Sequence, residues 1–498
     1  MTDAAIGASS LPVLLALILL RVPIGLAMFG VGLVGLVLVT GDWAVPLGRL
    51  KSETYTTFSS YTLSIVPMFL LMGQFATLGG LSGALFQATR GFLGHRRGGV
   101  AMASIAACAG FGAICGSSLA TAATMGRVAL PELRASGYDG GLATATLAAG
   151  GTLGILIPPS IVLVIYAILT DQNIANLFVA AIVPGILAAL GYMAAVALYV
   201  RRHPDRAGRS DRTPWPHRLH LVAAVWPVLL VFGLVVGGIY GGLFTPTEGA
   251  AVGAAGTALV AWRRGGLTPS TMATAFTETA TTTAMIFLIV LGAAFYNGFL
   301  ALTGVPQSIA AWVGSVDLPP VAVICVILLF YLVLGCVMDS LSMILLTIPI
   351  FWPVVQGLDV TFVTLADLHA ARAADALAAG IDLSPDMRAQ ITRVLADGAE
   401  LTRDQIRALE LRRVSQATLD RLNADRLALW FGILVLVVVE VGLITPPVGM
   451  NLFVINAMDR ATPMTATYRA VGWFVASDLM RVVLLVAVPG LVLWLVPW

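Results

Sequence analysis

Two apolar segments of the chain each contain a pair of adjacent prolines beside small polar residues. The first, 150–160, reads GGTLGILIPPS, and the second, 441–451, reads VGLITPPVGMN. Two adjacent prolines remove two amide donors and clash with the preceding turn, so a helix that enters either segment must end and begin again. The carbonyl groups left free at such breaks can replace the water shell of a sodium ion, and the helix N-termini can face a carboxylate.

Hydroxyl groups gather upstream of each Pro-Pro pair, and an acid lies among them in the second half, where the sequence predicts the tip of a helical hairpin. Ser117 lies in GAICGSSLAT, and Asp339 lies in GCVMDSLSM. Serine and threonine in membrane helices usually bond back to their own carbonyls, so it is their clustering at two equivalent breaks that indicates a site. The candidate sodium- and substrate-binding residues are Gly116, Ser117, Ser118, Thr152, Gly154 and Pro158 in the first half, and Asp339, Ser340, Ser342, Glu440, Gly442, Thr445, Pro446 and Asn451 in the second.

Acidic residues inside a membrane are functional candidates because a charge is costly to bury in lipid. Asp339 at the second tip and Glu440 at the second break could neutralise a sodium ion or hold the cavity open. Glu440 is equally well explained as an anchor between helices. Asp478 and Arg481 lie three residues apart, the spacing of neighbours on one helix face, so we expect them to pair with each other.

The composition is that of a polytopic membrane protein. Of the 498 residues, 58% are hydrophobic and 11% are charged, and the mean hydropathy is +0.93, which is far more apolar than a soluble domain. We interpret the apolar run 11–39 as a membrane helix rather than a signal peptide, because no basic segment precedes it and no convincing cleavage site follows. The net charge of +2 reflects topology in the lipid bilayer and does not indicate nucleic-acid binding.

Cysteine and histidine usage excludes several classes of membrane enzyme. The four cysteines lie in apolar stretches without a CxxC spacing, and the five histidines fall in hydrophilic connections. A haem or a histidine metal site inside the membrane would therefore have no ligands. The sequence also lacks the intramembrane Ser-His pair or HExxH motif of a membrane protease. We expect no catalytic residues, no organic cofactor, and no metal other than coupling sodium ions at the candidate residues.

The chain contains an internal duplication. Pro23 in RVPIGLAMFG resembles Pro246 in FTPTEGAAVG, and 94 residues separate Pro23 from Ser117 just as 94 separate Pro246 from Ser340. SETYTTFSS in the first half also resembles TETATTTA in the second. These two segments contain the acids Glu53 and Glu278. We place both at helix starts and interpret them as caps or scaffold contacts.

The duplication predicts an all-α membrane fold built from two inverted repeats. Each repeat has three spanning helices, a re-entrant hairpin, a broken helix and a final spanning helix. If both hairpins are re-entrant, each repeat crosses the membrane five times, and the odd number inverts the second repeat. The predicted boundaries are 1–200 for the first repeat with hairpin 98–130 and broken helix 141–170, 201–220 for a basic cytoplasmic linker, and 221–498 for the second repeat with hairpin 319–356 and broken helix 428–457.

Arginine placement agrees with this topology. From an outside N-terminus, the inside connections hold sixteen arginines, whereas the outside connections, apart from the insertion, hold only Arg49 and Lys51. This is the positive-inside bias of a membrane protein. It places both chain termini and the feet of the second hairpin outside, and the basic feet of the first hairpin in the cytoplasm.

The second repeat carries about 65 extra residues, roughly 360–425. This insertion holds no run long enough to span a bilayer. Ser384 followed by Pro385 predicts a helix start, and Thr402 with Gln405 predicts a capping box. We therefore expect three or four short amphipathic helices that form a small soluble domain. Because the insertion interrupts an outside connection, we predict that this domain is periplasmic.

Several motifs resemble those of one family: GFGAICGSSLATAAT, LPELRASGY, GGTLGILIPPS, ALWFG and EVGLITPPVGMN. In order and spacing they are similar to the large membrane (M) subunit of tripartite ATP-independent periplasmic (TRAP) transporters. The resemblance covers nearly everything except the insertion, which departs from the family pattern and puts receptor docking in question rather than the transport core. It implies an elevator-type secondary transporter of the bacterial inner membrane that imports an organic acid, a carboxylate, with a sodium gradient. It also implies two partners, a periplasmic solute-binding receptor (P subunit) and a small four-helix membrane (Q) subunit that is not fused to this chain.

Two other interpretations stand beside this one. A single-component sodium and carboxylate symporter of related architecture would need no receptor, and transport of free substrate by the purified chain would favour it. A membrane enzyme or a scaffold without transport activity is the weaker alternative, and the sequence lacks the intramembrane Ser-His, HExxH or bis-histidine set that such an enzyme would need.

Overall fold

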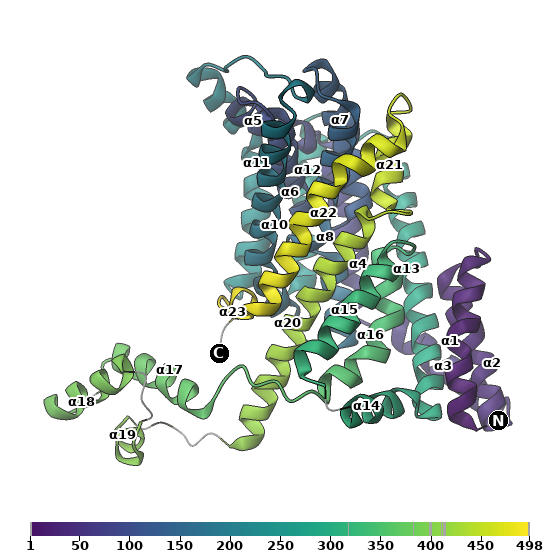
Figure 1. The fold of residues 1–498 in the computed structure, drawn as a ribbon, viewed down its shortest axis with the longest axis vertical. Helices are drawn as coiled ribbons and strands as arrows, with labels where there is room; N and C mark the ends of the chain where they lie inside the picture. The colour runs from purple at the N-terminus through teal and green to yellow at the C-terminus, as the bar shows by residue number, and fades with distance from the viewer. Residues whose placement is uncertain are drawn as a thin grey trace. The chain divides into compact units, whose positions relative to one another are not determined.

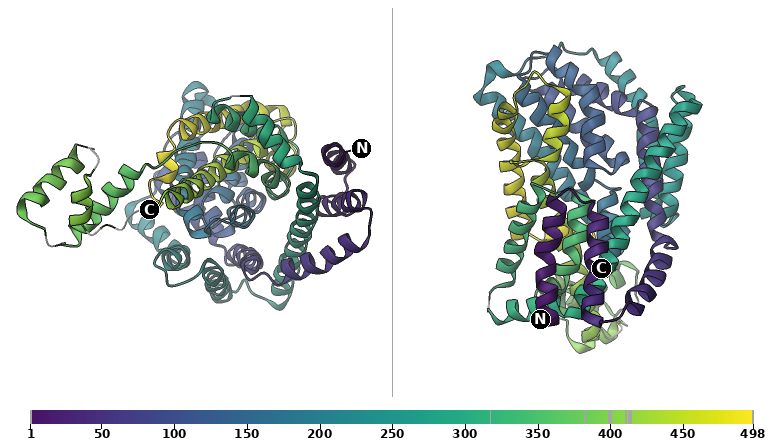
Figure 2. Two further views of the ribbon diagram at one scale, coloured as in Figure 1. Left: turned by 90° about the horizontal axis from the view of Figure 1, so that it is seen from below. Right: turned by 90° about the vertical axis from the view of Figure 1, so that its right-hand side faces the viewer.

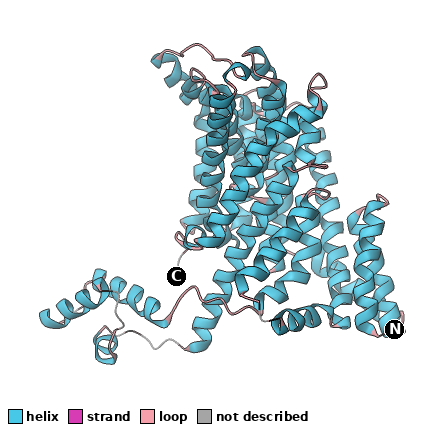
Figure 3. Ribbon diagram, in the orientation of Figure 1, coloured by secondary structure: helices cyan, strands magenta, loops and turns pink. Residues whose placement is uncertain are grey.

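The computed structural model describes residues 2–316, 318–381, 383–397, 401–409, 411 and 415–496, and this part of the chain is helical without a β-strand (Figures 1 and 3). It divides into two compact units, one of residues 1–357 and 429–498 and one of residues 358–428. The α-helices are α1 Asp3–Leu19, α2 Ile24–Thr40, α3 Ala44–Phe58, α4 Ile65–Leu78, α5 Leu81–Leu93, α6 Gly99–Cys115, α7 Ser118–Ala135, α8 Gly140–Leu156, α9 Ile161–Leu169, α10 Ile174–Arg202, α11 Trp215–Tyr240, α12 Pro246–Arg263, α13 Pro269–Thr303, α14 Val305–Ser315, α15 Pro320–Gly335, α16 Ser340–Gln356, α17 Leu365–Ala378, α18 Pro385–Ala396, α19 Arg403–Ala408, α20 Gln416–Ile444, α21 Met450–Met458, α22 Met464–Ala487 and α23 Gly490–Leu493.

The helix order repeats in the first unit. Hairpin α6–α7 corresponds to hairpin α15–α16, the interrupted pair α8–α9 to the pair α20–α21, and α10 to α22. Figures 1 and 2 show the first hairpin toward the upper end of this unit and the second toward the lower end, so the two enter from opposite sides. The predicted inverted-repeat architecture is confirmed.

The hairpin helices are too short to cross a bilayer. The longest of the four hairpin helices, α7, has 18 residues, which at 1.5 Å per residue is about 27 Å, against about 30 Å of hydrocarbon. Within the described ranges, five helices are long and apolar enough to cross a membrane, or seven if each of two bent pairs counts as one span. One bent pair is α8–α9, whose two parts meet at 43°.

The two repeats interlock through helices outside the hairpins. α2 of the first repeat packs along α13 of the second, and α4 of the first packs along α12 of the second. Glycines allow the close approach in the first pair, because a Cβ on Gly32 would lie 2.7 Å from the backbone nitrogen of Tyr296. Small residues serve this purpose in membrane helix packing generally. We call α1, α2, α4 and α11–α13 the frame, and the hairpins with α8–α10 and α20–α22 the core.

Several boundaries differ from the sequence prediction, which also places spanning helices at 60–80 in the first repeat and 275–300 in the second. A polar helix, α3, precedes the expected span 60–80 and meets it at 54°. The expected span 275–300 is longer, because α13 begins at Pro269 and ends at Thr303. The second broken helix begins not at 428 but at Gln416, so the last part of the predicted insertion 360–425 is continuous with it.

The smaller unit contains the short helices α17, α18 and α19. The helix start at Ser384 and the capping box at Thr402 and Gln405 both form as predicted. Ala373, Ile391 and Leu409, one from each of these helices or its end, make a small buried cluster. The side-chain amide of Asn423 binds the segment that leads into this unit. Its Oδ1 accepts hydrogen bonds from the backbone nitrogens of Phe362 and Val363 at 2.8 and 2.9 Å.

Candidate functional site

The tip of the first hairpin lies against the first break. Gly116 at this tip has φ +63°, a conformation that favours glycine, and a Cβ there would lie 3.1 Å from the carbonyl oxygen of Pro159. A Cβ on Gly154 would lie 2.8 Å from the carbonyl oxygen of Ser117. The first repeat therefore brings its predicted tip and break residues into direct contact.

The second tip and break are in contact in the same way. A Cβ on Gly442 would lie 2.5 Å from the Cα of Gly335, just as a Cβ on Gly112 would lie 2.7 Å from the Cα of Gly154. These two glycine pairs occupy equivalent positions, since Gly112 and Gly335 each lie five residues before a tip serine. The backbone nitrogen of Gly449, just after the second break, also donates to the carbonyl of Cys336 at 3.4 Å.

Asp339 and Ser117 begin the second helices of the two hairpins. Asp339 is the N-cap of α16, and its carboxylate accepts from the backbone nitrogen of Ser342 at 3.1 Å and from the Ser342 hydroxyl. Ser117 is the N-cap of α7, and its hydroxyl makes no capping bond. The first-turn amides of α7 thus keep their capacity to bind an anion. Ser118 and Ser340, in the first turns, are buried.

Thr152 and Glu440 belong to a buried polar network. Both lie six residues before a Pro-Pro pair. The Thr152 hydroxyl is 3.1 Å from the Tyr192 hydroxyl, which donates to Asp478 at 2.7 Å. Arg481 pairs with Asp478 at 2.9 Å, as predicted, and with Glu440 at 2.8 Å. The structure therefore favours the anchor interpretation of Glu440, which joins α20 to α22.

The other predicted residues lie at or beside the breaks. The bonds Pro158–Pro159 and Pro446–Pro447 are both cis. The Thr445 hydroxyl bonds back to the carbonyl of Val441 at 2.5 Å. Asn451, fully buried on α21, donates to the carbonyl of Ala148 on α8 at 3.2 Å and so links the two repeats, while its Oδ1 has no partner among the described residues.

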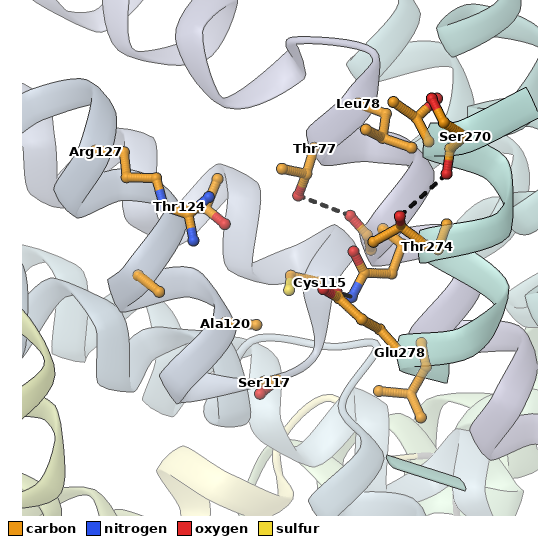
Figure 4. A pocket seen from close by; sticks show the side chains of 16 residues that line it. Thr77, Leu78, Cys115, Ser117, Ala120, Thr124, Arg127, Ser270, Thr274 and Glu278 are labelled. Atoms are coloured by element: carbon orange, nitrogen blue, oxygen red, sulfur yellow. Dashed lines mark hydrogen bonds between the residues drawn. The ribbon is translucent and has the colours of Figure 1, made fainter. Parts of the chain in front are cut away.

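A polar pocket of about 450 Å³ lies beside the first tip, between core and frame (Figure 4). One wall is α7, and the facing walls are α4 and α13 of the frame. Of the predicted residues only Ser117 lines this pocket. The lining residues are Leu70, Gly73, Gln74, Thr77, Leu78, Cys115, Ser117, Ala120, Ala123, Thr124, Arg127, Ser270, Thr271, Thr274, Ala275 and Glu278.

The pocket holds polar residues that sequence reasoning missed. Glu278 was expected at a helix start, but it lies in the interior of α13, and its Oε2 accepts from Gln74 on α4 at 2.9 Å. Its repeat counterpart Glu53, also expected at a helix start, lies in the interior of α3 and pairs with Arg49 at 3.1 Å. Arg127, counted only as a topology signal, lines the pocket from α7. The only available signal was charge inside an apolar region, which is a functional indication by itself.

Comparison with known proteins gives consistent results. The family described as "Tripartite ATP-independent periplasmic transporter, DctM component" matches residues 11–491. The chain is 32% identical over 451 residues to the C4-dicarboxylate TRAP transporter large permease protein DctM of Pseudomonas aeruginosa, which covers 90% of this chain and 89% of the relative. It is 31% identical over 355 residues to the ectoine/5-hydroxyectoine TRAP transporter large permease protein UehC of Ruegeria pomeroyi, covering 70% of this chain and 81% of the relative.

A solved structure shares the fold. The crystal structure of the Alcanivorax borkumensis YdaH transporter superposes with a TM-score of 0.58 over 91% of each chain, at 16% sequence identity. At this identity the likeness concerns architecture alone.

Proposed function

The chain belongs to the DctM component family of tripartite ATP-independent periplasmic transporters, and from this we propose that it is the permease subunit through which an organic anion enters the cell with sodium ions. The observation that carries the proposal is the contact of each hairpin tip with the helix break of its own repeat, together with a pocket between core and frame beside the first tip. Such breaks supply carbonyl and hydroxyl ligands for sodium and free amides for a carboxylate. The proposed ligands are the tip and break residues of both repeats.

The position of the pocket supports an elevator mechanism. Its walls belong partly to α7 of the core and partly to α4 and α13 of the frame, so a movement of the core along the frame changes the pocket. The core holds together as one body, because α7 packs on α21 and α16 packs on α9, each across the repeats. We propose that the helices joined by these contacts move together.

The proposed partners are a periplasmic solute-binding receptor and a small membrane subunit in the bacterial inner membrane. The word tripartite in the family description supports this composition. The relatives' names differ in substrate, a C4-dicarboxylate in one case and ectoine in the other. The carboxylate is therefore argued not from a relative but from the groups of α7 that attract an anion, which are Arg127 at the pocket and the free first-turn amides.

The direct test is uptake by vesicles that contain the chain and its small subunit. The receptor, encoded by a neighbouring gene, is added to the solution outside the vesicles. An inward sodium gradient should drive accumulation, and Ser117→Ala and Asp339→Asn should weaken the sodium dependence. Accumulation driven equally well without sodium would contradict the coupling. Uptake of free substrate without any receptor would favour the single-component symporter instead.

A further inference from the structure

The pocket beside the first tip carries charges of opposite sign on facing walls. Arg127 on α7 is its only basic lining residue and Glu278 on α13 its only acidic one, within the part of the chain that the structure describes. Figure 4 shows the two on opposite sides of the cavity, with Thr124 beside Arg127 and Cys115 and Ala120 near Glu278. A ligand that spans the pocket meets a cation at one end and an acid at the other.

Both charged groups keep free capacity for a ligand. Arg127 makes no ion pair with any described residue and is exposed to the pocket. Gln74 donates to Oε2 of Glu278, and Oε1 has no hydrogen-bond partner in the described ranges. The guanidinium of an arginine matches a carboxylate in geometry and charge, whereas a carboxylate such as Glu278 accepts from hydroxyl or ammonium donors.

We propose that the substrate is a monocarboxylate whose other end carries hydrogen-bond donors, a hydroxyl or an ammonium group, and that Glu278 selects against a second carboxylate. This inference rests on the proposed function and assigns the substrate class of the same pocket. Arg127 receives the carboxylate, and Glu278 with the threonine hydroxyls of α13 receives the donor end.

A dicarboxylate fits this pocket poorly for an electrostatic reason. Its second carboxylate would face Glu278, and like charges brought together in a site suppress the wrong ligand. The N-terminus of α7 at Ser117 carries only about half a positive charge, which does not offset the full negative charge of Glu278. The cavity volume of about 450 Å³ is within the usual range for small-molecule sites, so size does not exclude a four-carbon acid.

Three four-carbon carboxylates that differ only at the far end test the proposal: 4-aminobutyrate, 4-hydroxybutyrate and succinate. Ala120 lines the pocket and is exposed, so Ala120→Cys in a chain whose four native cysteines are replaced supplies a label inside the site. Each compound is scored by the concentration that halves the rate of maleimide labelling, and by its thermal stabilisation of the unmodified chain. We expect succinate to protect at least about tenfold more weakly, which is about 1.4 kcal/mol.

Variants at Glu278 make the test specific. Glu278→Gln should bring the three compounds to within about threefold of one another, and Glu278→Arg should make succinate the best ligand, because two cations then face two carboxylates. The matched control is Glu53→Gln, the repeat counterpart outside the pocket, which should leave the order unchanged.

Three outcomes would overturn the inference. They are succinate protecting the unmodified chain best, Glu278→Gln leaving the ratio of the three compounds unchanged, and none of the three compounds protecting the chain. Sodium-driven uptake with the receptor is measured separately. If this uptake is absent, the proposed function is contradicted. If it is present but the chain prefers succinate, only the substrate class is contradicted.

Discussion

Individual glycines decide how closely the hairpins approach the broken helices. At Gly154 an added methyl group would lie 2.5 Å from the Thr121 hydroxyl oxygen and 2.8 Å from the Ser117 carbonyl oxygen. The Ser117 carbonyl belongs to the backbone of the tip, so it cannot move without displacing the tip. The same argument holds for Gly442 against Gly335 in the second repeat, so the two sites have the same steric requirement.

Gly154→Ala should therefore impair both stability and transport. Overpacking of this kind costs about 1–3 kcal/mol, and the displaced tip should reduce receptor-dependent uptake severalfold. The control is Gly30→Ala on α2, where nothing lies within 4 Å of the added Cβ and the change should be neutral or stabilise by up to roughly 1 kcal/mol. Thermal unfolding in detergent and vesicle uptake measure the two effects, and equal behaviour of both variants would refute the contact argument.

The buried network at Arg481 gives a second residue-scale prediction. Arg481→Gln leaves the carboxylates of Glu440 and Asp478 buried without their cation, which costs about 3–5 kcal/mol. Adding Glu440→Gln and Asp478→Asn should restore most of the loss, because no unpaired charge remains. The half-exposed pair Arg49–Glu53 is the control, since Arg49→Gln should cost less than about 1 kcal/mol. Denaturant unfolding in detergent would contradict the prediction if the triple variant were no more stable than the single one.

Local spacing determined which residue contacts were predictable. The Asp478–Arg481 pair follows from three-residue spacing on one helix, and it forms. Glu440 lies 41 residues from Arg481, and Tyr192 lies 286 residues from Asp478, so their places in the network depend on packing that no local pattern encodes. Glu278 was misplaced for a similar reason, because its threonine-rich surroundings concealed one continuous helix.

Among the elements, the hairpins and breaks were the most predictable. Adjacent prolines end a helix wherever they occur, and the short apolar runs on either side of Ser117 and Asp339 required tips there. The helix α3 was missed because its sequence, AVPLGRLKSETYTTF, lacks a long apolar run. Its buried residues Pro46 and Thr57 give no recognisable period.

The sidedness of the hairpins remains a prediction that labelling can test. Cysteine at position 96, at the foot of the first hairpin, should react only from the cytoplasm, and cysteine at position 318, at the foot of the second, only from the periplasm. The reason is the excess of arginine on inside connections. An impermeant maleimide applied to cells and to inverted vesicles, in a background without native cysteines, distinguishes the sides. Reaction of both positions from one side would contradict opposite entry.

At the scale of the whole molecule, duplicated spacing predicted the inverted repeats. The packing of frame helices across the repeats could not be predicted, because it depends on both halves together.

The fold alone does not determine the role of the insertion. We propose that the unit of residues 358–428 is periplasmic and helps to position the receptor, because it interrupts a connection expected outside. A solvated helical cap without a transport role is the alternative.

Replacement of residues 365–415 by a Gly-Ser linker tests this role. It keeps Asn423 and its bonds to Phe362 and Val363, so the membrane core should fold and its melting temperature should change little. We expect receptor affinity and receptor-dependent uptake to fall several-fold. Uptake and affinity that both survive the replacement would leave the cap interpretation. A control that substitutes only exposed arginines of α18 separates loss of charge from loss of the unit.

The interlocked frame has a consequence for how the chain is made. Gly32 on α2 packs against Tyr296 on α13, 264 residues later in the sequence. At bacterial synthesis rates of about 5–20 residues per second, α2 waits in the bilayer for roughly 10–50 s before its partner leaves the ribosome. During that interval its glycine-lined face is covered by lipid or by another protein. Packing of the first repeat is thus completed only after α13 of the second has been translated.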